Sequence, residues 1–249
     1  MFSKKSNRKV APSVPSGSRG PVERRRRGRP PGRTKEGEAT RRRLYTLSVR
    51  MIATRGYEAT TLRDIAKRAG VSPGLLYRYF PSKRAVVLAL YDDLSTEYAV
   101  RASRMGAGPW QDRFLFALEA SLDVLGRQRA TLAALTSVLF GDAEGGLFAP
   151  ATAASRRRVE AVFHEAVRGA SDAPSAEAVA ALGRILYFAH LAIILWWLLD
   201  KSSRQRATKE LIALLSLSLP FVGPALWREP ARTFVETVSR LCGEGLLGG

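Results

Sequence analysis

The segment from Thr60 to Lys83 carries hydroxyl, aromatic and cationic side chains at spacings that suit contact with a nucleic acid. We expect it to form two short helices joined by a turn at Gly70, which can adopt the left-handed conformation that such a turn needs. Ser72 is placed to cap the second helix. This arrangement predicts a helix-turn-helix whose second helix enters the major groove of DNA.

Apolar residues within the same segment are expected to hold the two helices together. Ala66 is small enough for a close helix crossing, and the predicted inward positions are Ile65, Ala69, Val71, Leu76 and Phe80. The second helix is then expected to present the remaining side chains outward. These are Pro73, Gly74, Leu75, Tyr77, Arg78 and Tyr79.

Each outward residue suits a particular DNA contact. Arg78 could donate two hydrogen bonds to a guanine or instead grip a phosphate, and the sequence leaves both readings open. Pro73 and Gly74 allow a close approach to the bases, where Leu75 could touch a thymine methyl group. Thr60 and Thr61 begin the first helix of the pair. We expect Thr60 to cap it, and both threonines to offer hydroxyl and amide groups to phosphate.

The segment from Leu44 to Leu90 resembles the tetracycline-repressor (TetR) family of transcriptional regulators. The matching residues are Thr60, Thr61, Asp64, Ile65, Ala66, Ala69, Gly70, Val71, Ser72, Gly74, Leu76, Tyr77, Tyr79, Phe80, Ser82 and Lys83. In the family, the positions of Tyr77, Tyr79 and Lys83 usually hold the DNA backbone. The resemblance implies an all-α chain with an N-terminal three-helix helix-turn-helix domain and a C-terminal helical ligand-binding and dimerisation domain.

Charge is distributed very unevenly along the chain. Residues 1–35 hold 12 Lys and Arg against one acidic residue, and residues 36–91 hold 11 against four. The remaining residues hold 17 of each sign, so the entire net charge of +18 lies in the N-terminal part. Clustered cations release counterions from phosphate and speed encounter with DNA. The charge therefore favours double-stranded DNA as the partner of this region.

The first 36 residues are rich in Ser, Gly, Pro and Arg, and we expect a disordered basic arm there. Its Arg-Gly-Arg-Pro piece, which contains Arg29, is similar to the core of an AT-hook that lies in the minor groove. A nonspecific phosphate-binding arm is an equally good interpretation. We expect the helix-turn-helix domain to span 37–92 and the regulatory and dimerisation domain 93–249.

Beyond this arm, the periodicity predicts helices throughout, with no alternating strand pattern. The first helix is expected at 38–55, and later ones near 110–128, 131–140, 152–169, 175–200, 204–219 and 230–242. The apolar stretch 185–199 is shorter than the ~20 residues that cross a bilayer and contains His190. We therefore expect a buried helix there, with a membrane-associated regulator as an alternative.

The helices at 175–200 and 204–219 carry more apolar surface than one domain can bury, which predicts a homodimer on a palindromic operator. The residues chosen for the dimer interface are Leu186, Ile193, Ile194, Trp197, Leu211 and Leu215. The resemblance also implies a pocket for a small apolar effector. Candidate lining residues are Phe114, Phe140, Tyr187, His190 and Trp196, although aromatic residues at helical spacing are more often ordinary core. His190 is the polar group that could orient an effector.

Catalysis is not expected, because the two histidines and the single Cys242 form no recognisable catalytic or metal-binding motif. We expect no cofactor, no metal and no secretory signal, and a reducing, cytoplasmic location. The favoured function is a sequence-specific repressor that an effector releases from its operator. The alternative is an architectural DNA-binding protein without sequence preference or effector.

Overall fold

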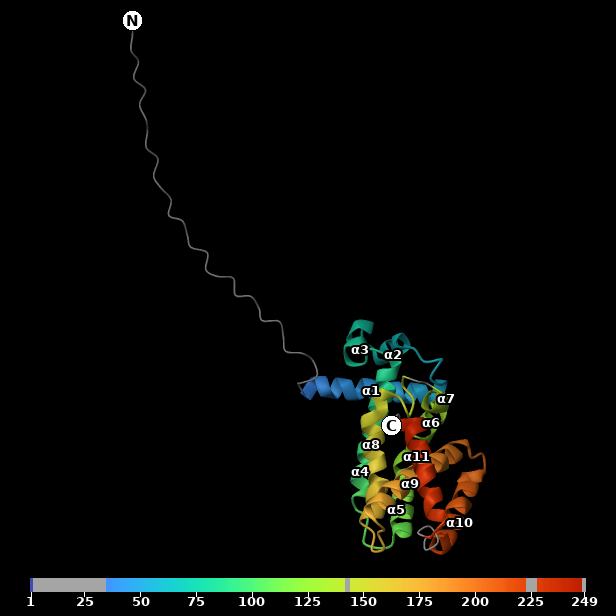
Figure 1. The fold of residues 1–249 in the computed structure, drawn as a ribbon. Helices are drawn as coiled ribbons and strands as arrows, with labels where there is room; N and C mark the ends of the chain where they lie inside the picture. The colour runs from blue at the N-terminus through green and yellow to red at the C-terminus, as the bar shows by residue number, and fades with distance from the viewer. Residues whose placement is uncertain (2–34, 142–143, 223–227, 248–249) are drawn as a thin grey trace.

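The computed structural model describes residue 1 and residues 35–141, 144–222 and 228–247. All regular secondary structure within these residues is helical, which confirms the all-α prediction (Figure 1). The α-helices are α1 Lys35–Arg55, α2 Leu62–Ala69, α3 Pro73–Tyr79, α4 Lys83–Ala102, α5 Trp110–Gly126, α6 Arg129–Ala134, α7 Thr136–Gly141, α8 Ala153–Arg168, α9 Ala176–Leu199, α10 Arg206–Val222 and α11 Ala231–Cys242.

Helices α1, α2 and α3 form a small head at one end of the molecule (Figure 1). Helix α1 lies across the top of the remaining bundle, and α2 and α3 pack on its far side. The most deeply buried apolar side chains of the head are at most 1% exposed. They are Leu44, Ile52, Ile65, Ala66, Leu76 and Phe80. The predicted inward positions of both helices of the turn therefore form its core, with Ala69 and Val71 half-buried at the edge.

Local hydrogen bonds end and begin these helices close to the predicted positions. Gly70 ends α2 in the left-handed conformation, with φ of 67°. Ser72 accepts a hydrogen bond from the amide of Leu75 at 3.2 Å, and Ser82 accepts one from Ala85 at 3.1 Å. Each hydroxyl satisfies an amide that the first turn of a helix leaves without a partner. The turn between α2 and α3 is thus set by residues within it.

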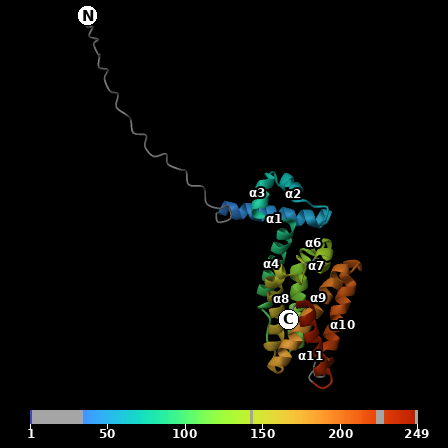
Figure 2. The same ribbon diagram turned by 45° about the horizontal axis from the view of Figure 1, so that its top comes forward.

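Helix α4 runs from the head into the bundle, where it packs against α5 and α8 (Figure 2). Helix α8 also packs along α9. A Cβ atom at Gly183 of α9 would lie 2.9 Å from the Cα atom of His164 on α8. Glycine therefore allows the two helices to approach closely at this point.

The predicted helix at 131–140 is wrong in one respect, because it is broken into α6 and α7 at Leu135. Leu135 has φ of −101° and ψ of 3°, outside the helical range. The hydroxyl of Thr136 donates to the carbonyl of Ala133 at 2.9 Å. The break lets α6 turn its outer surface toward α1, so this short helix lies between the bundle and the head (Figure 2).

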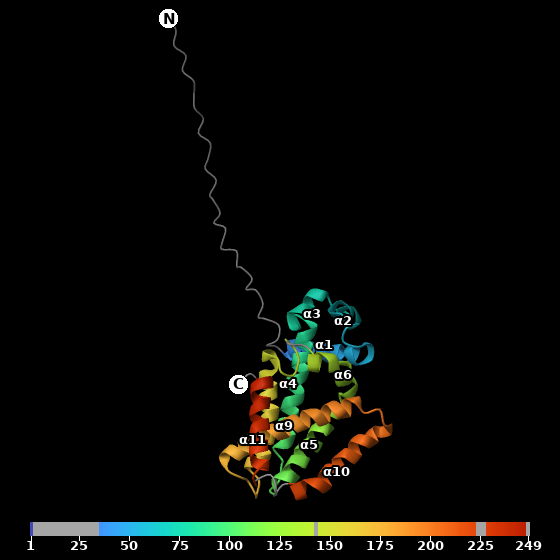
Figure 3. The ribbon, with the colours of Figure 1, turned by 45° about the vertical axis from the view of Figure 1, so that its right-hand side comes forward.

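Helix α9 is long and apolar enough, with a mean hydropathy of 2.0, to pass as a membrane span. However, 56% of its most apolar stretch is buried inside the protein. It packs against α8 and α11, while α10 lies along the outer side of the bundle (Figure 3). Burial against neighbouring helices accounts for its apolar composition, as expected from the sequence.

Candidate DNA interface and internal cavity

Helix α3 stands at the end of the head and presents its polar and aromatic side chains to solvent. Ser72, Pro73, Gly74 and Arg78 are exposed, and Tyr77 is 45% exposed. Leu75 and Tyr79 are half-buried, so each offers only part of its side chain to a partner. Because Leu76 is fully buried between them, the rotation of α3 about its axis is fixed by the core.

Thr61, and not Thr60, caps α2, so that prediction was wrong by one residue. The hydroxyl of Thr61 lies 2.6 Å from a carboxylate oxygen of Asp64 and accepts the Asp64 amide at 3.1 Å. The hydrogen bond from the Thr61 hydroxyl, ahead of a backbone bond, lowers the pKa of Asp64 despite its desolvation. Thr61 remains exposed beside this capping box.

The predicted phosphate contact of the Thr60 side chain is also wrong. Thr60 is completely buried, and its hydroxyl donates to the Gly56 carbonyl at 2.7 Å. A second, longer contact of 3.4 Å reaches the carbonyl of Met51. The side chain therefore joins the end of α1 to the start of α2 and does not reach the DNA-facing surface.

Lys83 at the start of α4 has partners that the sequence did not predict. Its ammonium donates to the Tyr57 carbonyl at 2.7 Å and lies 4.3 Å from the centre of the Tyr57 ring. An ion pair of 3.9 Å to Glu58 adds a weaker attraction. Lys83 thus anchors the loop before α2, and its contact with the DNA backbone stays a prediction.

Further cations on the head were not singled out from the sequence. The exposed basic side chains of α1 and α2 are Lys35, Arg41, Arg42, Arg43, Arg50, Arg55, Arg63, Lys67 and Arg68. The uneven charge of the chain pointed to this region without naming them. Arg29, predicted to enter the minor groove, lies outside the described residues.

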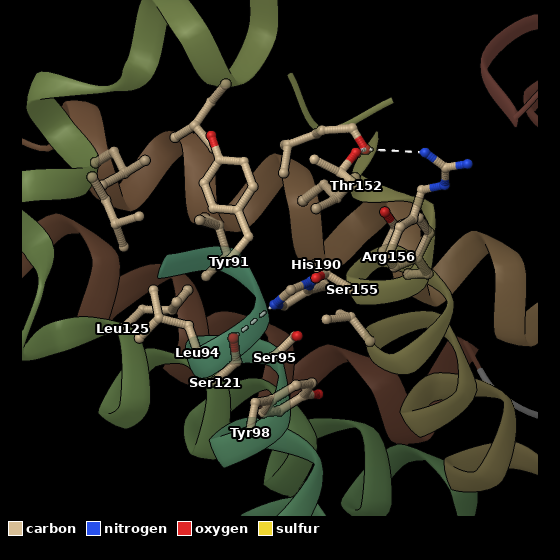
Figure 4. Close-up of a pocket in the computed structure, with 18 of the residues that line it drawn as sticks. Tyr91, Leu94, Ser95, Tyr98, Ser121, Leu125, Thr152, Ser155, Arg156 and His190 are labelled. Carbon is tan, nitrogen blue, oxygen red and sulfur yellow. Dashed lines mark hydrogen bonds between the residues drawn. The ribbon is translucent and has the colours of Figure 1, made fainter. Parts of the chain in front are cut away.

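A cavity of about 120 Å³ lies within the bundle, lined mainly by apolar side chains of α4, α5, α8 and α9 (Figure 4). Of the predicted lining residues, Phe140, Tyr187 and His190 border it. Phe114 does not, because it is buried in the core beside Phe163 with ring centres 6.0 Å apart. Trp196 does not either, since it points outward and is 51% exposed.

The polar groups of the cavity wall centre on His190. Its Nε2 atom lies 2.8 Å from the Ser121 hydroxyl, and its ring stacks parallel to that of Tyr98 with centres 6.1 Å apart. Burial lowers the pKa of His190 to about 3, so the ring is neutral at physiological pH. Burial likewise raises the pKa of Tyr98, which keeps its hydroxyl protonated. Neither Tyr98 nor Ser121 was predicted from the sequence.

Most residues predicted for the dimer interface are buried within the single chain, so those predictions were wrong. Leu186, Ile193, Ile194 and Trp197 are at most 8% exposed. They face the core because α9 packs against neighbouring helices on several sides. Leu211 and Leu215 are half-buried against the same core. The exposed apolar residues of α9 and α10 are Trp196, Leu199, Leu214, Leu217 and Phe221.

Comparisons with known proteins agree with this architecture. Residues 44–90 match the family model described as bacterial regulatory proteins, tetR family. The HTH-type transcriptional repressor KstR of Mycolicibacterium smegmatis is 29% identical over 182 residues, covering 69% of this chain and 82% of the relative. A KstR of Mycobacterium tuberculosis is 29% identical over 179 residues, covering 69% of this chain and 76% of that protein.

Solved structures share the fold at low sequence identity. A TetR transcriptional regulator from Nitrosomonas europaea superimposes with a TM-score of 0.53 at 19% identity, covering 73% of this chain and 98% of that one. Another from Rhodococcus sp. RHA1 has a TM-score of 0.52 at 24% identity, covering 74% and 98%. The family match and the capped helix-turn-helix show that residues 44–90 form a DNA-binding domain of the TetR family of transcriptional regulators, and the solved structures share the overall fold.

Proposed function

We propose that this protein represses transcription by binding a palindromic operator as a homodimer, and that a small apolar effector releases it. The observation that carries the proposal is the solvent-facing side of α3, held by a core that leaves Tyr77 and Arg78 exposed. The similarity of the whole chain to proteins described as HTH-type transcriptional repressors supports repression over activation.

The proposed DNA contacts divide into base and backbone contacts. Arg78 is the candidate for guanine, with Leu75 against a thymine methyl group and Gly74 allowing close approach. Pro73, beside Gly74, would likewise allow a close approach to the bases. Phosphates would be held by Tyr77 and by the remaining polar residues of the predicted set. These are Thr61, Ser72, Tyr79 and Lys83, together with Arg29 of the N-terminal arm. Backbone contacts supply affinity and position, while the base contacts supply sequence preference.

The proposed dimer face lies on the outward side of α10 and the end of α9. Leu214, Leu217 and Phe221 follow a helical spacing on α10 and are 61%, 71% and 83% exposed. Trp196 and Leu199 continue the apolar surface on α9 at 51% and 58%. A second copy of the chain, packed about a two-fold axis, would remove these side chains from water and present two heads to one operator.

The cavity has two physical connections to the head. Leu132 of α6 borders the cavity, and α6 packs against α1. Tyr98 of α4 also borders it, and α4 begins at Lys83 directly after the helix-turn-helix. An effector that moves either helix would change the orientation of α3, so occupation of the cavity and DNA binding would be coupled.

DNA binding is tested by selecting bound fragments from random duplexes and titrating the selected operator against random DNA at physiological salt. We expect at least hundredfold preference for a palindrome with half-sites about one helical turn apart. Arg78→Ala should reduce the preference for the operator, while Tyr77→Ala should reduce the affinity for every duplex by the same factor. Arg157→Ala, on the exposed side of α8, is the matched charge control. Similar affinity for every duplex would instead establish the architectural alternative.

The dimer face is tested by sedimentation of Leu217→Glu, which places a charge at the centre of the proposed interface. We expect a monomer with reduced operator affinity and an unchanged helical spectrum. Val100→Glu is the matched control, because Val100 is an exposed apolar residue of α4 at 59% exposure. A Leu217→Glu protein that remains dimeric would contradict this face.

We also propose that the protein works in the cytoplasm, where its DNA target is located. Burial of most of α9 supports this over a membrane-associated regulator. Fractionation of expressing cells tests the point. Recovery of the protein in the detergent-extracted membrane fraction, rather than in buffer, would favour the membrane alternative.

A further inference from the structure

Two side-chain polar atoms of residues that line the cavity have no hydrogen-bond partner among the residues that the structure describes. They are the hydroxyl oxygen of Tyr98 and the Nδ1 atom of His190 (Figure 4). Both side chains are almost completely buried, at 3% and 4% exposure. A buried polar group without a partner costs stability, and such groups in native proteins call for an explanation.

The contact between Ser121 and His190 determines what the second of these atoms offers. Ser121 is buried, and the Nε2 atom of His190 is the partner of its hydroxyl. If Ser121 donates to Nε2, its proton is used and the neutral ring carries its own proton on Nδ1. The opposite tautomer would leave the hydroxyl proton of Ser121 without an acceptor. The favoured arrangement therefore gives each of two residues that line the cavity one unused hydrogen-bond donor, Tyr98 Oη–H and His190 Nδ1–H.

We propose that the cavity binds an uncharged, largely apolar molecule that carries a strong hydrogen-bond acceptor, such as a ketone oxygen, held by Tyr98 and His190. The inference deepens the proposed function, because it names the chemical class of the effector. The cavity is also lined by Leu94, Leu125 and Ile194, which offer only apolar contact, while the lining hydroxyls of Ser95 and Thr152 already have partners within the protein. The cavity therefore suits a ligand with one polar end, which accepts hydrogen bonds, and an apolar body, which contacts the apolar side chains.

Two competing ligand classes fit less well. A hydrocarbon would fill the apolar part of the cavity but leave both donors unsatisfied. A carboxylate would be desolvated beside a neutral imidazole, at a high cost in free energy. Arg156 also borders the cavity, but its guanidinium donates to the carbonyls of Leu147 and Ala149 at 3.2 and 3.5 Å. These contacts hold its Nη1 atom at the backbone, and the carboxylate probes described below test whether the rest of the guanidinium pairs with an acid.

The test uses matched probes on two skeletons, with the full-length protein. The first set is 2-acetylnaphthalene, 2-ethylnaphthalene and 2-naphthoate; the second is 2-undecanone, undecane and undecanoate. Calorimetric or fluorescence titration gives each Kd. We expect a ketone to bind more tightly than its hydrocarbon, by roughly two- to tenfold for each hydrogen bond, and more tightly than its carboxylate. Equal or tighter binding of the hydrocarbon or carboxylate would overturn the inference, as would failure of both ketones to bind.

Tyr98→Phe removes one donor and keeps the ring. It should weaken ketone binding roughly two- to tenfold and leave hydrocarbon binding unchanged. Ser155→Ala is the matched control, because Ser155 borders the same cavity and its hydroxyl has no part in the proposed contact. Equal losses in the two variants would refute the assignment. An infrared measurement on the wild-type protein with a ¹³C-labelled ketone adds a test without mutation: the carbonyl stretch must fall below its value in heptane.

Operator titration of the same samples separates this inference from the proposed function. If a ketone binds but does not release the operator, the proposed ligand class stands and the proposed role of that ligand as an effector is refuted. If the protein binds the operator but neither ketone, the proposed DNA-binding function stands and the proposed ligand class is refuted. Release by the ketone but not by its hydrocarbon would support both.

Discussion

Acidification should destabilise this protein through His190, which the fold keeps neutral. The imidazole is 4% exposed, between Ser121 and the rings of Tyr98 and Phe163, whose centres lie 6.1 and 4.8 Å away. Burial lowers its pKa from 6.5 to about 3. The unfolded chain exposes the same ring to water, where it takes up a proton near pH 6.5.

The sign follows from this difference. Below pH 6.5 the unfolded state binds a proton that the folded state refuses, so protonation favours unfolding. The contribution of His190 to stability is complete above pH 6.5 and is lost progressively as the pH falls toward 3. With these pKa values, the free energy of unfolding should fall by about 2 kcal/mol between pH 7 and pH 5 from this group alone.

Urea unfolding at fixed protein concentration, at pH 7 and pH 5, measures the effect. The double variant His190→Phe with Ser121→Ala removes the titrating ring and its partner together, and should lose about 2 kcal/mol less than the wild type over this interval. His164→Phe, at the half-exposed histidine of α8, retains His190 and should therefore retain its contribution. The same pH dependence in wild type and double variant would refute the reasoning.

Three further substitutions test particular packing contacts, each measured by urea unfolding. Gly183→Ala places a Cβ atom 2.9 Å from the His164 backbone and should cost about 1–3 kcal/mol by forcing α8 and α9 apart; an unchanged midpoint would show that the helices separate freely. Thr60→Val should cost about 1 kcal/mol but leave operator affinity per folded molecule unchanged, whereas weaker binding would restore the predicted phosphate contact. Arg129→Gln should cost about 1–3 kcal/mol, because its guanidinium donates to three carbonyls at the end of α9; no loss would show that water replaces it.

The helix-turn-helix could be predicted from the sequence because its geometry depends on neighbours in the chain. Gly70, Ser72 and Ser82 act on amides and carbonyls only a few residues away. The error at Thr60 shows the limit of that reasoning. Two adjacent threonines are equally good caps, and Asp64, three residues after Thr61, was the signal that distinguished them.

The cavity and the dimer face could not be predicted in the same way. Tyr98 and Ser121 belong to different helices, and only the packing of α4 and α5 around His190 brings them together. Helix α9 is apolar on nearly every side, so its periodicity did not distinguish Trp196, which is exposed, from Trp197, which is buried. The direction of such a helix's side chains depends on which neighbours pack against it, and that information is not local.

The arrangement of α4 ties the chemistry of the cavity to DNA affinity. This helix is 20 residues long, begins immediately beyond the head and contributes Tyr98 to the cavity wall. A helix of that length spans about 30 Å, so a small tilt at Tyr98 becomes a larger displacement at α3. A ligand shifts the equilibrium only by its difference in affinity for the two orientations. The factor by which an effector weakens operator binding must therefore equal the factor by which operator weakens binding of the effector. An effector that binds the cavity and leaves operator affinity unchanged would mean that the cavity and the head are not coupled.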